Sequence, residues 1–360
     1  MSNYPPPGFA AITEALEHWA IEQPGKRAYA WLGADGEIVS EHTYATLLAA
    51  AREFSSRLIA EGLVRGDRAV LICDHSMDFL EALWGCLLCG VIAVPMPAPR
   101  RNRQSDRVDT ILADCGAKVT VQGGVITRTS NTDAIAIHAP KDVVILQYTS
   151  GSTSVPKGVC ITNRSLIANL KAIDHIFDFS PAVVQVCWLP LYHDMGLIGS
   201  AFEPIWAGAT HIFLSPPNFL RNPYLWLQAI TRFRGSLAGA PNFAFDLCVE
   251  RITADEVETL DLSSLNVLYS GAEPIRAETL SRFEAKFAST GFRSNMWLPC
   301  FGMAESTLMF TGHRERVPPR ILKLNEDGMR LGVAKQEPGG KAFSVSCGTA
   351  APKHRIVIAN

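Results

Sequence analysis

Apolar and polar positions form blocks along the chain that predict helices and strands in turn. Residues 43–60 carry apolar side chains at helical spacing, with Thr43 suited to cap the helix and Gly62 to end it. Apolar runs at 68–73 and 91–96 predict buried strands, and a helical pattern lies between them. Because parallel neighbours need a long crossover connection, this strand–helix–strand order favours a mostly parallel sheet.

The same alternation returns in the second half of the chain. Helical patterns at 161–173 and 196–208 flank a strand-like run at 183–191, and 264–271 predicts a strand that ends in glycine. We therefore expect an α/β fold with two mostly parallel sheets flanked by helices. A short strand pattern near the end of the chain predicts the start of a third, small β subdomain.

These patterns divide the chain into four segments. We place a first α/β subdomain at 1–170, ending in a hydroxyl-rich loop, and a second one at 171–312. Residues 313–342 are charged and interrupted by glycine and proline, which indicates an excursion on the surface. Residues 343–360 begin the β subdomain and stop at a strand pattern, so we expect this subdomain to be truncated.

Composition narrows the functional classes. Hydrophobic residues make up 48% of the 360 residues, and the net charge of −2 gives no general attraction to nucleic acid or anionic membranes. The longest apolar stretches are too short to span a bilayer, and the N-terminus lacks a signal-peptide pattern. Cys86 and Cys89 form a C-x-x-C pair, but their apolar helical surroundings favour packing over metal binding. We expect a cytoplasmic protein with no nucleic-acid partner and no membrane span.

Residues 146–159 read LQYTSGSTSVPKGV and suggest a phosphate-binding loop, although they do not match the Walker A motif. That motif needs glycine where Pro156 stands and serine or threonine where Gly158 stands. Backbone amides around Gly151 can still surround an anion, and Lys157 adds a positive charge. Loop composition alone leaves a phosphate site and an ordinary Ser/Thr-rich turn as alternatives. The candidate phosphate ligands are Thr149, Ser150, Gly151, Ser152, Thr153 and Lys157.

Three further motifs follow predicted strands. WLPLYHDMGLIG carries His193, SGAEPI carries Glu273, and LPCFGMAES carries Glu305. Open α/β sheets bind their ligands at the carboxyl ends of their strands, where these residues are expected to lie. Each motif alone is a weak signal, and a buried structural histidine is the alternative interpretation of His193. Together with the loop, the four motifs predict one site.

TSGSTSVPKG, the His193 motif, SGAEP and FGMAE, in this order, resemble the adenylate-forming enzymes. The motifs LQYTSGST, LPLYHDMGLIG, GMAES and the late VSCG (345–348) are most similar to those of the fatty acyl-AMP ligases. This resemblance covers essentially the whole chain. The resemblance implies that a fatty acid carboxylate attacks the α-phosphorus of ATP, giving acyl adenylate and pyrophosphate. It further implies that the acyl group passes to the phosphopantetheine thiol of an acyl carrier protein.

The resemblance also implies roles for individual residues, with ATP and Mg²⁺ as cofactors. Thr149 to Thr153 would hold the β- and γ-phosphates, with Lys157 nearby, and Glu305 would hold Mg²⁺. His193 would lie beside the reacting carboxylate and the α-phosphate, so His193, Glu305 and Lys157 are the expected catalytic residues. His193, Met195 and Gly196 would begin the acyl tunnel. The expected adenine-binding residues are Gly271, Ala272, Glu273, Phe301, Gly302 and Met303.

The chain departs from the family pattern after VSCG. The ribose-binding T-G-D segment and the small mobile C-terminal domain with its catalytic lysine are not found, so we expect the large N-terminal domain alone, with slow turnover. Ser154 stands where many relatives have glycine. The segment 313–342 is our candidate for the insertion that distinguishes acyl-AMP ligases, a long loop being the alternative. An acyl-CoA synthetase and a non-catalytic acyl-adenylate or nucleotide-binding protein remain the alternative functions.

Overall fold

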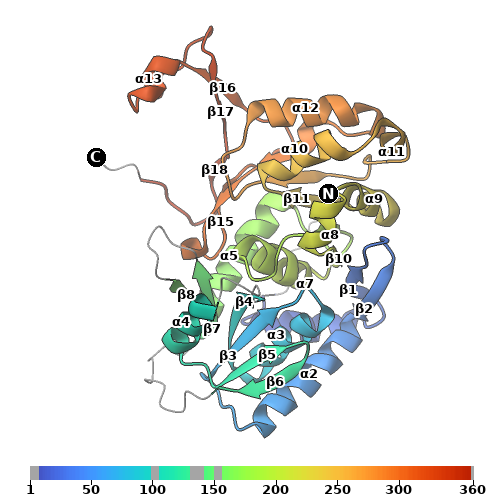
Figure 1. Cartoon of the computed structure of the whole chain (residues 1–360), viewed down its shortest axis with the longest axis vertical. Helices are drawn as coiled ribbons and strands as arrows, with labels where there is room; N and C mark the ends of the chain where they lie inside the picture. The colour runs from blue at the N-terminus through green and yellow to red at the C-terminus, as the bar shows by residue number, and fades with distance from the viewer. Residues whose placement is uncertain (1–7, 99–104, 130–141, 150–155, 358–360) are drawn as a thin grey trace.

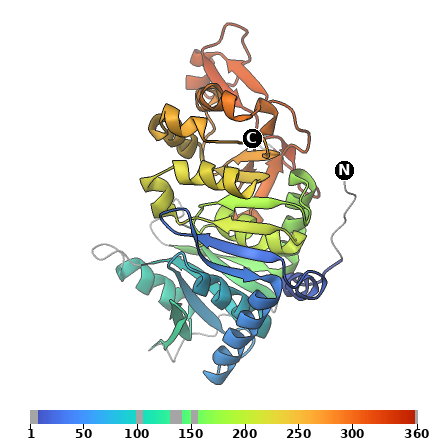
Figure 2. The same ribbon diagram turned by 90° about the vertical axis from the view of Figure 1, so that its right-hand side faces the viewer.

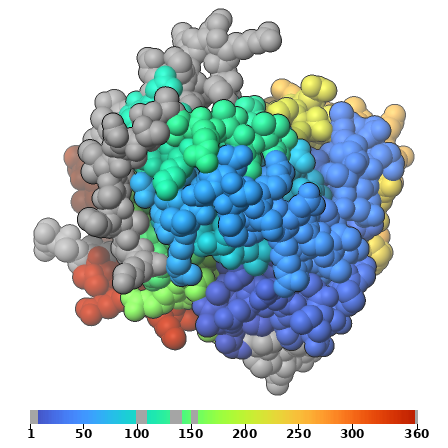
Figure 3. All heavy atoms as spheres, turned by 90° about the horizontal axis from the view of Figure 1, so that it is seen from below, coloured from blue at the N-terminus to red at the C-terminus, as the bar shows by residue number. Residues whose placement is uncertain are grey.

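The computed structural model describes residues 8–98, 105–129, 142–149 and 156–357. Two sheets form successive layers along the long axis, and a red excursion extends from the end opposite the first sheet (Figure 1). The first sheet and its helices form most of the other end of the molecule, which faces the viewer in Figure 3 and is coloured blue to green. This arrangement confirms the predicted α/β fold with two largely parallel sheets flanked by helices.

The first sheet has six strands in the order β6-β5-β3-β4-β7-β8. Its central pairs are parallel, whereas β5–β6 and β7–β8 are antiparallel. The helices of this region include α2, which starts with a capping box at Thr43, and α3, which ends where Gly90 adopts φ +74°. The elements are α2 (Tyr44–Ala60), β3 (Arg68–Cys73), α3 (Met77–Cys89), β4 (Ile92–Pro97), α4 (Ser105–Cys115), β5 (Val119–Gln122), β6 (Val125–Arg128), β7 (Val143–Thr149) and β8 (Lys157–Thr162).

The second sheet has seven strands in the order β13-β12-β11-β9-β10-β1-β2 and is parallel except for the β1–β2 pair. Its strands are β1 (Arg27–Leu32), β2 (Ile38–Thr43), β9 (Val184–Cys187), β10 (Thr210–Phe213), β11 (Leu237–Ala240), β12 (Val267–Ser270) and β13 (Trp297–Pro299). The helices and helical turns around it are α1 (Ile12–Glu22), α5 (Asn163–Phe177), α6 (Asp194–Gly196), the π-helix η1 (Leu197–Phe202), α7 (Glu203–Ala207), α8 (Pro216–Arg221), α9 (Tyr224–Phe233), α10 (Asn242–Arg251), α11 (Ala254–Glu258), α12 (Ala277–Phe287), η2 (Ala288–Thr290) and η3 (Ser294–Met296).

Strands β1 and β2 lie within the predicted first subdomain, yet they belong to the second sheet. Strand β1 pairs in parallel with β10, almost two hundred residues later, and the blue strands lie beside the green-yellow strands in Figure 2. Five of the six β1 residues are buried, so the strand needs cover on both faces. The predicted subdomain boundary at residue 170 therefore does not separate the strands of the two sheets, and the boundary itself stays a prediction.

The excursion predicted at 313–342 has secondary structure of its own. Strand β16 (Ile321–Leu324) pairs antiparallel with β17 (Ala342–Val345), and α13 (Glu326–Arg330) lies between them. Strand β17 thus belongs to the same hairpin as β16 and crosses the predicted boundary at 342. A separate small sheet, β14-β15-β18, is formed by Phe301–Gly302, Met309–Gly312 and Thr349–Ala350.

One large buried core extends through both layers. It includes Leu83 and Trp84 of α3, Tyr29 of β1 and Phe202 of the π-helix. The Tyr29 hydroxyl donates to the carbonyl of Ala201 and accepts from Trp84 Nε1 at 3.2 Å, so β1 connects the two layers. Among the described residues, no helix has both the length and the apolar character needed to cross a bilayer.

Candidate active site

The β7–β8 hairpin holds the ends of the predicted phosphate loop. Thr149 and Lys157 are directly opposite each other in the antiparallel register, so the two strands bring these predicted ligands together. The predicted ligands Ser150, Gly151, Ser152 and Thr153 lie outside the described residues. Just before the loop, Gln147 Nε2 donates to the carbonyl of Tyr192 at 2.7 Å. This bond joins the first sheet to the loop that carries His193.

His193 is held by its neighbour. Its Nδ1 lies 2.6 Å from Asp194 Oδ1, and the same oxygen accepts the backbone N–H of Met195 at 2.7 Å. The hydrogen bond to Asp194 raises the pKa of His193, against the opposing effect of burial. The imidazole side chain is 55% exposed and the Asp194 side chain only 10% exposed. Asp194 therefore orients the ring through Nδ1 and leaves Nε2 for a ligand.

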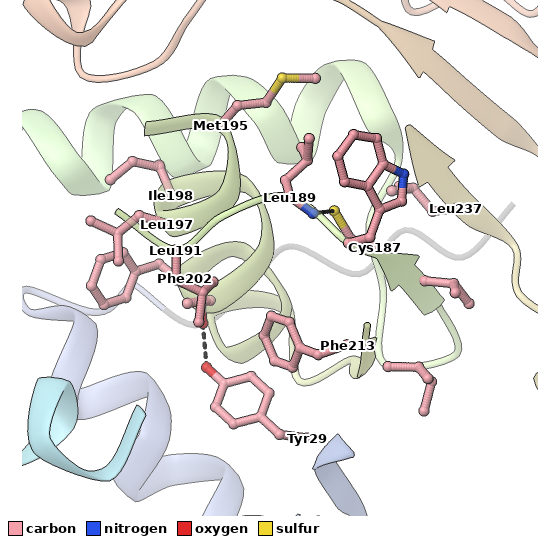
Figure 4. Packing of buried hydrophobic residues seen from close by; sticks show 14 of the residues in the cluster. Tyr29, Cys187, Leu189, Leu191, Met195, Leu197, Ile198, Phe202, Phe213 and Leu237 are labelled. Atoms are coloured by element: carbon pink, nitrogen blue, oxygen red, sulfur yellow. Dashed lines mark hydrogen bonds between the residues drawn. The ribbon is translucent and has the colours of Figure 1, made fainter. Parts of the chain in front are cut away.

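The chain after His193 needs glycine at 196 and then widens into a π-helix. A Cβ on Gly196 would lie 2.2 Å from the carbonyl oxygen of Pro190, so no larger residue fits there. The π-helix Leu197–Phe202 follows at once, and such turns are frequent at functional sites. In Figure 4, Met195 and Ile198 project from this segment, and the dashed line from Tyr29 marks its bond to the Ala201 carbonyl.

A cavity of about 230 Å³ brings most of the predicted residues together. His193 and Met195 lie here near Gly271, which follows β12, and Cys300, which follows β13. The predicted site residues that line it are His193, Met195, Gly271, Ala272, Phe301, Gly302 and Met303. Phe301 is 49% exposed, so this side of the cavity is open to solvent.

The inner wall of this cavity consists of residues that the motifs do not contain. Those side chains come from α5, the start of β11 and the middle of β12, and they are Ile173, Phe177, Leu237 and Tyr269. A Cβ on Gly239 would lie 2.3 Å from the Tyr269 ring, so glycine lets this ring lie across β11. Cys300 also lines the cavity, and burial raises the pKa of its thiol to about 12, which makes it a poor nucleophile.

Ala272 and Glu273 are neighbours in the SGAEP turn, but only Ala272 lines the cavity. Ala272 lines the cavity with φ +67°, an unfavourable conformation for a residue with a side chain and one that is often found at functional sites. Glu273 does not line the cavity. Its Oε1 instead accepts the backbone N–H of Phe243 at 2.7 Å, in the first turn of α10. A carboxylate at this helix N-terminus is favourable because of the helix dipole.

A second cavity, of about 250 Å³, continues the site toward the phosphate loop. Thr149 and Ala304 line it, and His193 and Asp194 line both cavities, so the two spaces meet at the histidine. Glu305 follows Ala304 in the 3-10 turn η4 (Ala304–Ser306) and is exposed.

Glu305 suits Mg²⁺ as a partial ligand. Mg²⁺ usually binds one or two carboxylates and completes its shell with water and phosphate oxygens. Within the described ranges, no group of three or more His, Cys, Asp or Glu side chains could hold a metal ion. A metal ion at Glu305 would thus have to complete its shell with water or with oxygens of a bound ligand.

A comparison with protein-family models identifies the AMP-binding enzymes, matched over residues 16–137 and 126–360. The chain belongs to this family. The match includes all four motifs and both cavities, and it confirms the resemblance to adenylate-forming enzymes.

Relatives of this AMP-binding enzyme include fatty-acid ligases. It is 31% identical to the medium-chain-fatty-acid–[acyl-carrier-protein] ligase JamA of Moorena producens, over 98% of the chain and 66% of JamA. It is also 31% identical to the long-chain-fatty-acid–AMP ligase FadD23 of Mycobacterium tuberculosis, over 75% of the chain and 52% of FadD23. The chain thus spans about two thirds or less of the length of these relatives.

A solved structure shares the fold closely. The fatty acyl-adenylate ligase of L. pneumophila, in complex with acyl adenylate and pyrophosphate, superimposes with a TM-score of 0.86 at 32% identity, covering 95% of this chain and 64% of that one.

In this AMP-binding enzyme the motifs could be recognised from sequence because they are local. The inner wall could not, since Phe177 and Tyr269 have the sequence pattern of ordinary core residues.

Proposed function

We propose that this chain carries the site for ATP-dependent activation of a fatty acid to acyl adenylate and pyrophosphate. The observation that carries the proposal is the meeting of two cavities at His193. One has an apolar inner wall that suits an acyl chain and the other extends to Thr149, beside the hydroxyl-rich loop. His193 therefore stands where an acyl carboxylate and an α-phosphate would react.

Each residue has a definite part in this step. Attack of the carboxylate on the α-phosphorus expels pyrophosphate, and the enzyme chiefly has to position the reactants and stabilise charge. His193, whose protonated form Asp194 favours, would donate from Nε2 to the oxygens that carry charge. Thr149 and Lys157 would hold the departing pyrophosphate, and Mg²⁺ at Glu305 would neutralise phosphate charge. Ala272 and Phe301 would enclose the adenine.

The proposed acceptor of the acyl group is the phosphopantetheine thiol of an acyl carrier protein. JamA, whose name specifies an acyl-carrier-protein ligase, supports this choice over free CoA. The excursion supports it as well, because 313–342 forms an ordered hairpin with β17 and is thus a candidate for the family-specific insertion. All nine cysteines are free, which fits a reducing compartment, and we place the protein in the cytoplasm.

Single-turnover assays test the adenylation step directly. The chain is mixed with ATP, Mg²⁺ and a fatty acid, and acyl adenylate is quantified by mass spectrometry. We expect formation of acyl adenylate that falls about a hundredfold or more in His193→Ala and Glu305→Ala. Lys157→Ala is compared with the control Lys323→Ala. Lys323 is an exposed lysine of β16 that is remote from the site in the sequence and belongs to a different sheet. Unchanged adenylation in Glu305→Ala would refute the metal role.

A further inference from the structure

The cavity at His193 is closed at its far end by two side chains. A third cavity, of about 310 Å³, lies beyond it, and Phe177 and Leu237 line both spaces. Phe177 is the last residue of α5 and Leu237 is the first residue of β11, and both are buried. These two residues therefore form a partition between an inner apolar cavity and an outer one.

Contacts at the end of α5 hold Phe177 in place. Its ring packs edge-on against Tyr269 at 5.4 Å between centroids, within the inner wall. Arg316 Nη2 donates to the carbonyl of Ile176 at 3.0 Å, and Arg314 lies 3.8 Å from Asp178. Both arginines come from the start of the excursion and meet the negative end of the helix dipole. The partition is thus anchored from the protein surface as well as from the core.

The two sides of the partition differ in chemistry. The inner cavity presents mainly apolar side chains such as Ile173, Phe179 and Leu308, whereas the outer one combines apolar residues such as Leu265 and Met296 with Arg293, Arg316 and Asn295. An apolar chain end gains from contact with the first set. In the outer cavity it would displace water from charged and amide groups without replacing their hydrogen bonds, which is unfavourable. An alkyl chain is therefore expected to end at the partition.

We propose that Phe177, together with Leu237, sets the length of the acyl chain and restricts the site to medium-length fatty acids. The inference rests on the proposed adenylation function and specifies its substrate class. The cavity of about 230 Å³ also has Ala272 and Phe301 in its lining, which we assign to the adenine, so only part of this space is left for the acyl chain. The names of the relatives do not decide the question, because they include a medium-chain and a long-chain ligase.

Binding of acyl-sulfamoyl adenosines tests the partition without requiring turnover. These stable analogues of acyl adenylate are titrated calorimetrically into the chain with hexanoyl, octanoyl, dodecanoyl and hexadecanoyl groups. In the wild type we expect the affinity to rise about fourfold per added methylene and then to fall at the longest chain. The hexadecanoyl analogue should bind to Phe177→Ala at least about tenfold more tightly than to the wild type.

Two further variants make the outcome decisive. Leu237→Ala removes the other half of the partition and replaces Phe177→Ala if that variant does not fold. Phe287→Ala creates a comparable gap in a fully buried part of α12 that lines neither cavity, and it should keep the wild-type length profile. Absence of binding by every analogue would refute the proposed function itself. Binding that rises through hexadecanoyl in the wild type, or an unchanged profile in both partition variants, would refute only the length limit.

Discussion

Asp194 favours the protonated form of His193 through one short hydrogen bond. The carboxylate lies 2.6 Å from Nδ1 and is itself nearly buried, so the pair is held in one arrangement. Because the bond raises the pKa of His193, the folded state binds this proton more tightly than the unfolded state does. The stability that the pair contributes is present below the ordinary histidine pKa and is lost as the pH rises through the raised one.

Replacement of Asp194 by asparagine is expected to lower the pKa of His193 toward the ordinary histidine value. The amide cannot supply the negative charge that favours the imidazolium. Acyl-adenylate formation near neutral pH should then fall about tenfold or more, because less of the histidine is protonated and its ring is less well oriented. Proton NMR titration of the imidazole measures the pKa, and single-turnover assays measure the activity.

A second histidine–carboxylate pair provides the control. His42 Nε2 lies 2.8 Å from Glu81 Oε1, and neither residue lines the cavities at His193. Glu81→Gln should leave acyl-adenylate formation unchanged. An Asp194→Asn variant that keeps the wild-type pKa of His193 would contradict the assigned role of the aspartate.

At the scale of elements, the turn from His193 into the π-helix determines the shape of the site. Gly196 has an ordinary helical φ of −75°, so its glycine is required by close packing and not by backbone conformation. Gly199 lies in the next turn and lines the inner cavity, and its carbonyl accepts from Gln185 Nε2 at 3.0 Å. The two glycines are therefore expected to tolerate substitution very differently.

Gly196→Ala and Gly199→Ala form a matched pair. At Gly196 the methyl group would overlap the carbonyl oxygen of Pro190 at 2.2 Å, and the backbone must move. We expect a loss of unfolding free energy of about 1–3 kcal/mol and weaker binding of acyl-sulfamoyl adenosines. At Gly199 the nearest atom, Leu308 Cδ2, would be 3.5 Å away, which is an ordinary contact.

The Gly199→Ala variant should keep or raise the stability, because alanine favours helical structure over glycine. Its methyl group takes space from the inner cavity, so the preferred acyl chain should become shorter. Denaturant unfolding and the analogue series measure both effects. Equal destabilisation of the two variants would show that packing against Pro190 is not the deciding contact.

At the scale of the whole molecule, a buried carboxyl group links stability to pH. Glu203 begins α7, which packs against α1 and α5, and it is fully buried. Neither carboxylate oxygen has a hydrogen-bond partner among the described residues. Burial, with a smaller contribution from nearby Asp174, raises the pKa of Glu203 well above its usual range. Burial and Asp178 likewise raise the pKa of Asp174 to about 7.

The protein should therefore lose stability as the pH rises from about 5 to 8. Above the ordinary glutamate pKa the unfolded chain has released the proton, whereas the folded chain retains it up to the raised pKa. Each such group contributes a fall of up to about 1.4 kcal/mol per pH unit. Glu203→Gln should flatten the dependence and stabilise the protein at pH 8, as denaturant unfolding at several pH values would show. Glu41→Gln, on the exposed ion pair with Arg27, should keep the wild-type slope.

The sequence by itself determined the fold class, the order of the motifs and many of the residues that line the proposed adenylate site. These features are local: apolar runs of strand length, glycine at turns and hydroxyl-rich or acidic residues just after strands. Thr149 and Lys157 could be named as ligands because they belong to one continuous motif, although the sequence did not predict their antiparallel pairing. His193 could be identified because its whole motif is continuous.

Only the tertiary structure decided which distant segments meet. The pairing of β1 with β10 depends on contacts across about half of the chain, and no local pattern encodes it. The carboxylate of Glu273 contacts α10 because that helix begins close to the SGAEP turn in space. Phe177 and Leu237 form the partition because α5 ends beside the start of β11. In the sequence both are simply apolar, and burial alone does not distinguish a core residue from one that limits a substrate.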